Sequence, residues 1–205
     1  MIIEVLTIGH SKHSAGRFIE LLRLHGVNAI ADIRSSPYSR FNPDFNRETL
    51  KQKLNENEIK YVFLGRELGA RSKDSSCYEQ GRVQYGRLAQ TDLFKEGIKR
   101  VLKGAQQYRL ALLCAEKEPL SCHRMLLVGR ELDAIGVNVL HIHEDGRLET
   151  QAQAVTRLIA LQGQSAGSLF RTNEEMISEA YMRQENKVAY VIEERQAEGN
   201  DKETT

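Results

Sequence analysis

Short apolar runs alternate with longer amphipathic segments up to about residue 160 of this chain. The apolar runs are 2–8, 27–33, 59–64, 109–115 and 137–142. Between them, apolar side chains recur at the spacing of one helix face. This alternation is typical of parallel strands joined by helices that cover both faces of the sheet. The sequence therefore predicts an α/β domain over 1–161 with a mostly parallel sheet of about five strands.

Turn and cap residues set the limits of the helices between these strands. Ser14 and Ser121 are residues that commonly cap a helix start, and Gly26 and Gly136 are suited to a helix end. The stretch from 65 to 87 contains four glycines and is expected to be loop-like. The predicted helices are 14–25, 46–57, 91–103, 121–135 and 148–161.

The composition of the chain changes after Leu161. Residues 162–172 are expected to form a linker, 173–198 an amphipathic helix and 199–205 a disordered tail. The helix would carry one apolar stripe, which must pack on another surface, either this domain or a second subunit. We expect a homodimer through 173–192. The stripe comprises Met176, Ile177, Ala180, Tyr181, Gln184, Val188, Val191 and Ile192.

Charge and cysteine usage narrow the possible partners. The 29 basic and 28 acidic residues give a net charge of +1, which argues against binding to nucleic acid or to a membrane surface by bulk charge. A local basic patch remains possible. No apolar stretch approaches the roughly 20 residues of a membrane span. The three cysteines and the lack of an export signal predict a cytoplasmic protein with reduced thiols.

Polar residues follow the predicted strands at their carboxyl ends, where open parallel sheets bind ligands. His10 and Ser11 follow the first strand, and Cys114 and Glu116 end the fourth. If the strand order is 3-2-1-4-5, the first and fourth strands are neighbours. These four side chains would then face one crevice. Asp32, Arg34 and Ser35 follow the second strand.

Cys122 is predicted in the first turn of a helix, beside His123 and Arg124. Free backbone amides and adjacent basic groups lower the pKa of a thiol, so Cys122 is a candidate nucleophile. Its proton partners would be His123, Glu116 or His10. The alternative is that Cys122 only packs the start of the helix.

Cys114 and Glu116 point to the same face of their strand, because side chains alternate along it. Cys114 could be simple core packing. Glu116 could serve as a base, as a partner for Arg34 or as a cap on a neighbouring helix.

A metal site is an alternative for the same residues. Cys114, Cys122 and His123 would be its ligands, with Glu116 and His10 nearby. The spacing C-x7-C-H lacks the close cysteine pairs of structural zinc sites, so the sequence assigns no metal ligand and leaves the cofactor open. His141 and His143 share a strand face, and buried packing is the ordinary role for such histidines.

The loop from 34 to 47 combines arginines with aromatic residues, a mixture suited to phosphate contacts and base stacking. The alternative is an ordered loop held by Pro37 and Pro43. A glycine-containing turn, 65–71, follows the third strand and could reach the same crevice. The loop carries Arg34, Arg40 and Arg47 with Tyr38, Phe41 and Phe45.

Five blocks of this sequence resemble the DUF488 family, a domain of unknown function. They are 7–11, 32–40, 45–46, 68–69, and the pair 114–116 with 122–124. They occur in the family's order, over about residues 4–145. The resemblance implies a Rossmann-like three-layer sandwich and a shared site formed by these blocks, but no reaction. Ala70 departs from the pattern, in which a second glycine follows Leu68-Gly69. The C-terminal extension lies outside the resemblance.

Together these features predict an enzyme that acts on an anionic small molecule, a nucleotide or a nucleobase. A module that binds nucleotides or nucleic acid without catalysis is the alternative. The candidate catalytic residues are Cys122, Glu116, His123 and His10. The residues predicted to bind substrate are Ser11, Asp32, Arg34, Ser35, Tyr38, Arg40, Gly69, Cys114 and Arg124.

Overall fold

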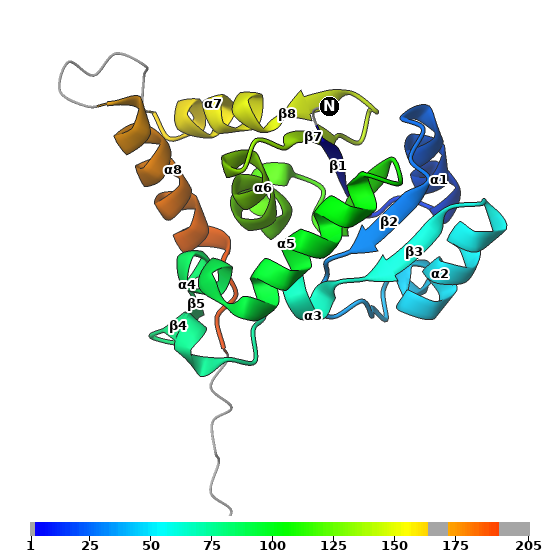
Figure 1. The fold of residues 1–205 in the computed structure, drawn as a ribbon, viewed down its shortest axis with the longest axis horizontal. Coiled ribbons are helices and arrows are strands. Elements are labelled where there is room, and N and C mark those ends of the chain that lie inside the picture. The colour runs from blue at the N-terminus through cyan, green and yellow to red at the C-terminus, as the bar shows by residue number, and fades with distance from the viewer. Residues whose placement is uncertain (1–2, 164–171, 193–205) are drawn as a thin grey trace, which may run out of the picture.

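The computed structural model describes residues 3–163 and 172–192 of the chain. Its centre is a six-stranded sheet in the order β3-β2-β6-β1-β7-β8, in which all strands run parallel except the edge strand β8 (Figure 1). The expected α/β class and mostly parallel sheet are confirmed, with six strands in place of about five. The strands are β1 (Glu4–Gly9), β2 (Ala29–Asp32), β3 (Lys60–Phe63), β6 (Leu110–Cys114), β7 (Asn138–Ile142) and β8 (Leu148–Thr150).

The strand order differs from the expected 3-2-1-4-5. β6, the fourth strand expected from the sequence, lies between β2 and β1 and pairs with both. β1 and β6 are neighbours as expected, but β2 and β1 are not. The chain leaves β2 toward one edge of the sheet and leaves β6 toward the other. Ligands bind where adjacent strands diverge in this way, so the crevice is expected between β2 and β6.

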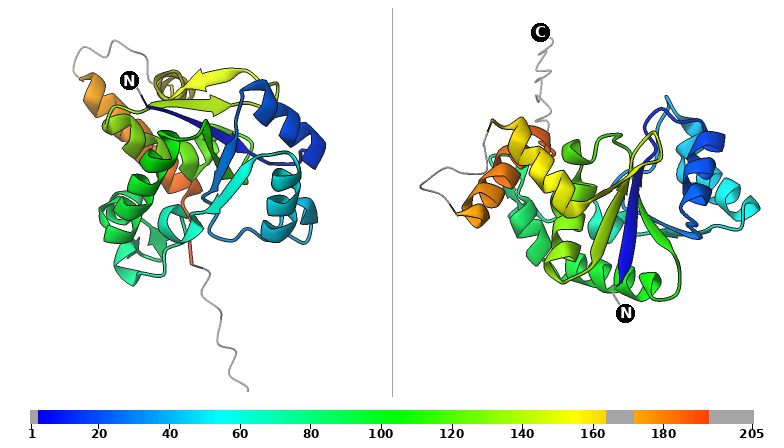
Figure 2. Two further views of the ribbon diagram at one scale, coloured as in Figure 1. Left: turned by 45° about the vertical axis from the view of Figure 1, so that its right-hand side comes forward. Right: turned by 90° about the horizontal axis from the view of Figure 1, so that it is seen from above.

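Helices cover both faces of the sheet and make three layers (Figure 2). Side chains of β6 alternate between two apolar cores: Leu110 and Leu112 face one, Ala111 and Leu113 the other. The second core is closed by α1 (Ala15–Leu24) and α2 (Arg47–Glu56). The first is closed by four helices: α5 (Asp92–Ala105), α6 (Arg130–Ala134), α7 (Gln151–Leu161) and α8 (Asn173–Val188).

The stretch expected to be loop-like, 65–87, contains short regular elements. They are α3 (Gly65–Leu68), the 3-10 turn η2 (Ser75–Cys77), the strands β4 (Tyr78–Glu79) and β5 (Arg82–Val83), and the start of α4 (Tyr85–Gln90). None is long enough to show a hydrophobic period, because the longest covers less than two helical turns. The closing helix also differs from expectation, since 148–150 form β8 and α7 begins at Gln151.

The chain around Cys122 differs from the predicted helix start. Ser121 ends a 3-10 turn, η3 (Pro119–Ser121), and does not cap a helix. The carbonyl of Cys122 accepts the backbone N–H groups of Met125 and Leu126, which begin the π-helical turn η4 (Arg124–Gly129). The helix therefore begins later than the sequence indicated, and Cys122 lies between the 3-10 turn and the helix.

The C-terminal helix α8 packs on the same domain. Its buried residues are Met176, Ala180 and Tyr181, and Gln151 of α7 donates a hydrogen bond of 2.7 Å to the Tyr181 hydroxyl. The helix ends at Val188, earlier than the expected 198. Most of the expected linker (164–171) and the tail (199–205) lie outside the described residues. Self-association through 173–192 stays a prediction.

The segment after α8 runs beside the β4–β5 hairpin. The N–H of Val83 donates to the Tyr190 carbonyl, and the N–H of Ile192 donates to the Gly81 carbonyl. This pairing fixes residues 190–192 near the pocket described next. No helix in the described part of the chain has the length and apolar composition that a bilayer-spanning segment requires.

Candidate functional site

A pocket of about 210 Å³ opens at the carboxyl ends of β2 and β6. This is the point where the two neighbouring strands diverge, the usual ligand site of an open parallel sheet. Its walls come from the loops after both strands, the turn at 70–71, α4 and the segment after α8. The lining residues are Arg34, Ser35, Ser36, Ala70, Arg71, Tyr85, Cys114, Ala115, Glu116, Ser121, Cys122, His123, Val188 and Tyr190.

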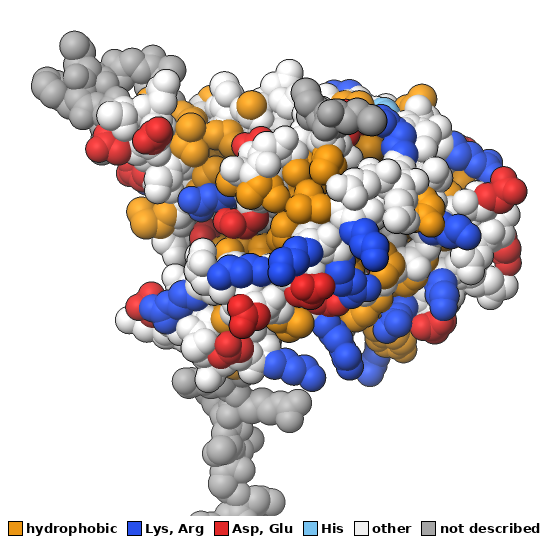
Figure 3. Space-filling view, in the orientation of Figure 1, with side chains coloured by type: hydrophobic (Ala, Val, Ile, Leu, Met, Phe, Trp, Pro, Cys, Tyr) orange, Lys and Arg blue, Asp and Glu red, His pale blue; other side chains and the backbone are white. Residues whose placement is uncertain are grey.

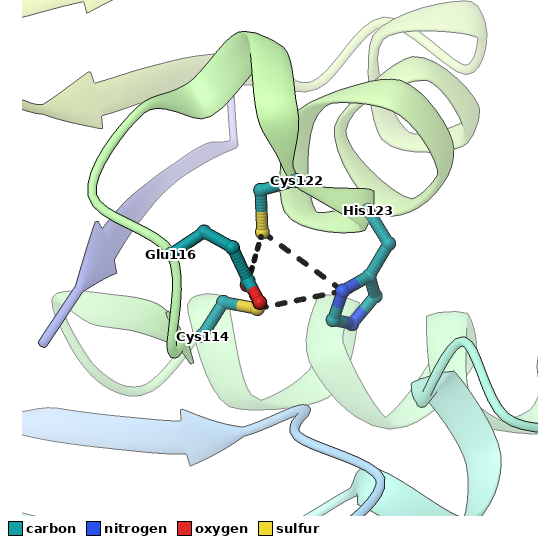
Figure 4. Close-up of side chains that lie close together, drawn as sticks. All are labelled: Cys114, Glu116, Cys122 and His123. Atoms are coloured by element: carbon teal, nitrogen blue, oxygen red, sulfur yellow. Dashed lines mark hydrogen bonds between the residues drawn. The ribbon is translucent and has the colours of Figure 1, made fainter. Parts of the chain in front are cut away.

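Four side chains meet at the floor of this pocket, and we call them the Cys–Glu–Cys–His cluster: Cys114, Glu116, Cys122 and His123 (Figure 4). Cys114 is the last residue of β6, and Glu116 follows two residues later. Cys122 and His123 come directly before the next helical turn, η4, and their side chains lie near the end of β6. One strand–loop–helix connection thus supplies all four groups.

The reactive atoms of the cluster lie within 4.8 Å of one another. Cys114 Sγ is 2.9 Å from Glu116 Oε2 and 3.4 Å from His123 Nδ1. Cys122 Sγ is 3.3 Å from the same carboxylate oxygen and 3.9 Å from the same ring nitrogen. Each thiol therefore contacts both the acid and the imidazole.

The backbone fixes the orientation of His123. Its Nε2 lies 3.1 Å from the carbonyl oxygen of Ile33, which only accepts hydrogen bonds. The proton of the neutral ring is therefore assigned to Nε2, and the lone pair of Nδ1 faces the two thiols. His123 can accept a proton from a thiol or bind a cation without turning its ring.

The two thiols differ in acidity. Burial raises the pKa of Cys114, but the Cys122 thiol, His123 and Glu116 around it outweigh burial and hold the pKa well below its ordinary value. Burial and the neighbouring Cys114 raise the pKa of Cys122 well above that value. We expected the lowered pKa at Cys122; it falls on Cys114 instead, whose sulfur lies nearer to both the carboxylate and the imidazole.

The pKa values of Glu116 and His123 are both raised above their ordinary values in the cluster. Burial and the adjacent Cys114 raise the pKa of the Glu116 carboxyl. Burial lowers the pKa of His123, but the nearby Cys114 and Glu116 outweigh it and raise the pKa overall. A strongly perturbed group in a cleft is characteristic of a functional site.

Arg34 and Asp32 form a buried ion pair beside the cluster. Arg34 Nε and Nη2 donate to the two Asp32 oxygens at 2.9 and 2.6 Å, and the Tyr61 hydroxyl donates to Asp32 Oδ2 at 2.7 Å. Asp32 is fully buried and does not line the pocket, contrary to its predicted contact with substrate. It neutralises much of the charge that Arg34 brings to the wall.

Arg71 carries a positive charge at the pocket without a carboxylate partner among the described residues. Its guanidinium lies 4.6 Å from the centre of the Tyr190 ring, a cation–π contact. Its backbone N–H donates to Ser35 Oγ at 3.0 Å. Ser35 thus links the loop after β2 to the turn that carries Arg71.

Arg124 holds the loop of the site rather than the pocket. It is fully buried, donates to the backbone carbonyls of Glu116 and Lys117, and does not line the pocket. Gly69 has a similar packing role, because a Cβ there would come within 2.5 Å of Ser35 Oγ. Both were predicted to bind substrate, and the structure instead gives them positioning roles.

The end of β1 lies outside the pocket. His10 stacks on Phe45 with ring centroids 4.4 Å apart, and burial together with the Arg34 charge lowers its pKa to about 4. His10 and Ser11 were expected in the crevice because the first strand was expected beside the fourth, with the crevice between them. β1 does lie beside β6, but the pocket opens on the other side of β6, toward β2, so neither residue lines it.

The middle of the basic and aromatic loop, residues 38–41, lies outside the pocket. Tyr38 is 69 % exposed and Phe41 fully exposed, and neither they nor Arg40 line the pocket. The predicted contact of Tyr38 and Arg40 with the substrate is not supported by this placement. Contact with nucleic acid stays a prediction.

Sequence reasoning missed one wall of the pocket. Tyr85 comes from α4, Val188 is the last residue of α8, and Tyr190 lies in the segment after it. The basic turn containing Arg71 was a usable signal, since it follows a strand end. Nothing in the pattern around Tyr190 indicated that it would contact residues 119 positions earlier in the chain.

A larger groove of about 720 Å³ lies between α6, α7 and α8. Its walls are mostly apolar, and apolar side chains gather on this face in Figure 3. Of the charged residues, only Arg130 and Asp133 line it. The groove has none of the reactive groups found at the smaller pocket.

Comparison with protein families gives one match. The model of a family described as "Domain of unknown function DUF488" matches residues 14–130. The chain belongs to the DUF488 family. The matched segment contains the whole Cys–Glu–Cys–His cluster, but the DUF488 match ends before Val188 and Tyr190. Neither the curated proteins nor the solved structures include a match to this chain.

Proposed function

We propose that this chain is an enzyme that acts on a small anionic molecule in the pocket between β2 and β6. The observation that carries the proposal is the cluster at the pocket floor. Two thiols, a carboxylate and an imidazole place their reactive atoms within 4.8 Å of one another beside two arginines. Convergent nucleophilic and acid–base groups of this kind in a cleft are the usual signature of an active site.

Charge at the pocket favours an anion. Asp32 offsets Arg34, whereas Arg71 is left to bind an incoming negative group. Hydroxyl groups of Ser36, Ser121 and Tyr85 line the same walls. Burial raises the pKa of Tyr85, so its hydroxyl stays protonated and able to donate. A carboxylate or phosphate oxygen would find these donors.

Size favours a small substrate. The volume of about 210 Å³ is below the roughly 300–1,000 Å³ of pockets that enclose drug-sized ligands. The pocket therefore admits a small metabolite or the anionic end of a larger one. This favours a small anion over a whole nucleotide among the substrate classes that the sequence suggested.

Two chemistries are open to the cluster. Cys114 can lose its proton to His123 and attack the substrate as a thiolate, with Glu116 supplying a proton. Alternatively, the thiols and the imidazole can hold a metal ion that activates water. Both place the reacting atom at the same point of the pocket. We expect the protein to work in the cytoplasm, where its three free thiols stay reduced.

The first prediction concerns turnover. A mixture of small carboxylated and phosphorylated metabolites is incubated with the protein, and mass spectrometry follows each compound. Wild type should consume at least one compound, and the double variant C114S/C122S should lose about 100-fold or more of that rate because it lacks both reactive sulfurs.

The control is Cys77→Ser, which removes the third buried cysteine without touching the pocket. It should keep the wild-type rate. Consumption that is equal in wild type and in the double variant, or absent from both, would contradict the proposed enzyme.

A further inference from the structure

Four donor atoms converge on one point at the floor of the pocket, as Figure 4 shows. They are two cysteine sulfurs, one ring nitrogen and one carboxylate oxygen. Thiolate, imidazole and carboxylate are the protein ligands of zinc, and sulfur-rich sets favour it over magnesium or calcium. The donor types in this cluster are therefore those of a zinc site.

Three of the distances between these donors are close to those around a tetrahedral ion. Zinc bonds of about 2.3 Å to sulfur and about 2.0–2.2 Å to nitrogen or oxygen put the donors of a tetrahedron about 3.4–3.8 Å apart. Cys114 Sγ and Cys122 Sγ lie 3.4 and 3.9 Å from His123 Nδ1. Cys122 Sγ lies 3.3 Å from Glu116 Oε2. The separation between Cys114 Sγ and Glu116, 2.9 Å, is shorter and would widen around an ion.

The surroundings of the ligands have the form that metal sites need. A metal-binding histidine usually donates its second ring N–H to a carbonyl or carboxylate, as His123 Nε2 does to Ile33. The backbone N–H of Arg124 lies 3.4 Å from Cys122 Sγ and would stabilise a thiolate there. Both contacts fix ligand atoms that point toward the centre of the cluster.

An ordinary hydrogen-bonded cluster explains the same residues less well. Thiols are weak hydrogen-bond donors and acceptors, and here two of them share one carboxylate oxygen and one nitrogen. Three groups that ionise to anions face a single imidazole. A bound dication would offset two of these three negative charges and would use every donor present.

We propose that Cys114, Cys122 and His123 bind a zinc ion in this pocket, with Glu116 as a fourth, exchangeable ligand. Glu116 is an exposed residue as a whole, while the other three residues of the cluster are buried. Catalytic zinc sites keep three protein ligands and one position for water or substrate. The catalytic role of the ion rests on the proposed function, whereas its binding does not.

The experiment measures metal in the full chain, expressed with zinc supplied and purified without chelator. Elemental analysis should find about one zinc per chain in wild type and in Cys77→Ser, and less than about one tenth in the double variant C114S/C122S. Replacement by cobalt should give thiolate-to-metal charge-transfer absorption and the intense visible bands of a tetrahedral ion.

Glu116→Gln tests the fourth ligand without removing a sulfur. This variant should keep about one zinc per chain but release it to a chelator at least several-fold faster than wild type. Its cobalt spectrum also reports on ligation should the double cysteine variant fail to fold.

Wild type with far less than one zinc per chain, or cobalt protein without thiolate charge transfer, would overturn the proposal. Metabolite turnover that persists in such metal-free protein would leave the proposed function standing and reject only the ion. Stoichiometric zinc without any turnover would support the ion as structural and reject the enzyme.

Discussion

His141 lies on β7 with both ring nitrogens in hydrogen bonds. The Nε2 atom is 2.8 Å from Gln151 Oε1, and Nδ1 is 2.7 Å from the Thr7 hydroxyl. Gln151 uses its amide group to donate elsewhere, so its oxygen accepts from Nε2 and Thr7 donates to Nδ1. The buried ring is therefore neutral, and its partners leave no place for a second proton.

This arrangement predicts a pH dependence of stability. Burial and the Arg124 charge lower the pKa of His141 to about 3, below its ordinary value of 6.5. The unfolded chain therefore binds a proton more readily than the fold, and stability falls as the pH drops from about 6.5 toward 3. The loss from this residue should approach about 1.4 kcal/mol for each pH unit below about 6.

Urea unfolding of wild type and His141→Gln at pH 7, 6 and 5 measures this effect. The variant is expected to be less stable at pH 7, and its deficit should shrink as the pH falls, because it lacks the titrating ring. A deficit that stays constant over the three pH values would show that His141 does not titrate differently on folding.

The residues of the Cys–Glu–Cys–His cluster could be predicted from the sequence, but the contacts among their side chains could not. The positions of Cys114, Glu116, Cys122 and His123 at a strand end and a helix start indicated reactive groups near one rim of the sheet. The choice between the two thiols depends on which sulfur lies centrally, a matter of ångströms that spacing does not fix. The C-x7-C-H spacing likewise does not show that these donor atoms meet in space, so it did not identify them as a ligand set.

At the scale of elements, the end of β1 is packed tightly against the loop after β6. A Cβ on Gly9 would lie 1.8 Å from the Glu116 carbonyl oxygen and 2.3 Å from the Arg124 guanidinium. The backbone oxygen cannot move without displacing the loop that carries Glu116. Only a residue without a side chain fits there.

Gly9→Ala should therefore lower the free energy of unfolding by at least about 2 kcal/mol, measured by urea denaturation. Gly86→Ala in α4 is the matched control, because no atom lies within 4 Å of its added Cβ. That variant should be neutral or stabilised by up to about 1 kcal/mol. Equal effects of the two substitutions would contradict the packing argument.

The main strands and helices could be predicted from the spacing of apolar residues, but the order of the strands in the sheet could not. The five apolar runs all became strands, and in β2 and β6, which are buried throughout, the run is continuous because both faces are covered. Their order depends on how far each crossover travels across the sheet, which no local pattern records. β8, β4 and β5 are three residues or fewer and leave too little pattern to detect.

At the scale of the whole molecule, the pocket joins segments from the two ends of the described chain. The loop after β2 provides Arg34 and Ser35, and the end of α8 and the segment after it provide Val188 and Tyr190. Sequence analysis left open whether the C-terminal stripe packs on this domain or on another subunit. It packs on this domain and completes a wall of the pocket.

The contact between Tyr190 and Arg71 leads to a further prediction. Inorganic phosphate or sulfate should raise the melting temperature of wild type if the pocket binds anions. Tyr190→Ala should weaken the apparent anion affinity about 2- to 5-fold, since a cation–π contact contributes about 0.5–1 kcal/mol.

Tyr190→Phe keeps the ring and should respond to the anions as wild type does. Arg71→Gln should lose most of the response, whereas Lys73→Gln, which removes the same charge two residues away and outside the pocket, should keep it. If the alanine and phenylalanine variants behave alike, the ring does not position Arg71.

The wall formed by Tyr190 has a consequence for how this protein can diverge. The Cys–Glu–Cys–His cluster belongs to the stretch that the family model matches, while part of the pocket wall is contributed by a segment beyond it. Duplicated copies could exchange or rewrite that segment and acquire new preferences while inheriting the same chemistry. Engineers could graft alternative sequences after Val188 for the same purpose.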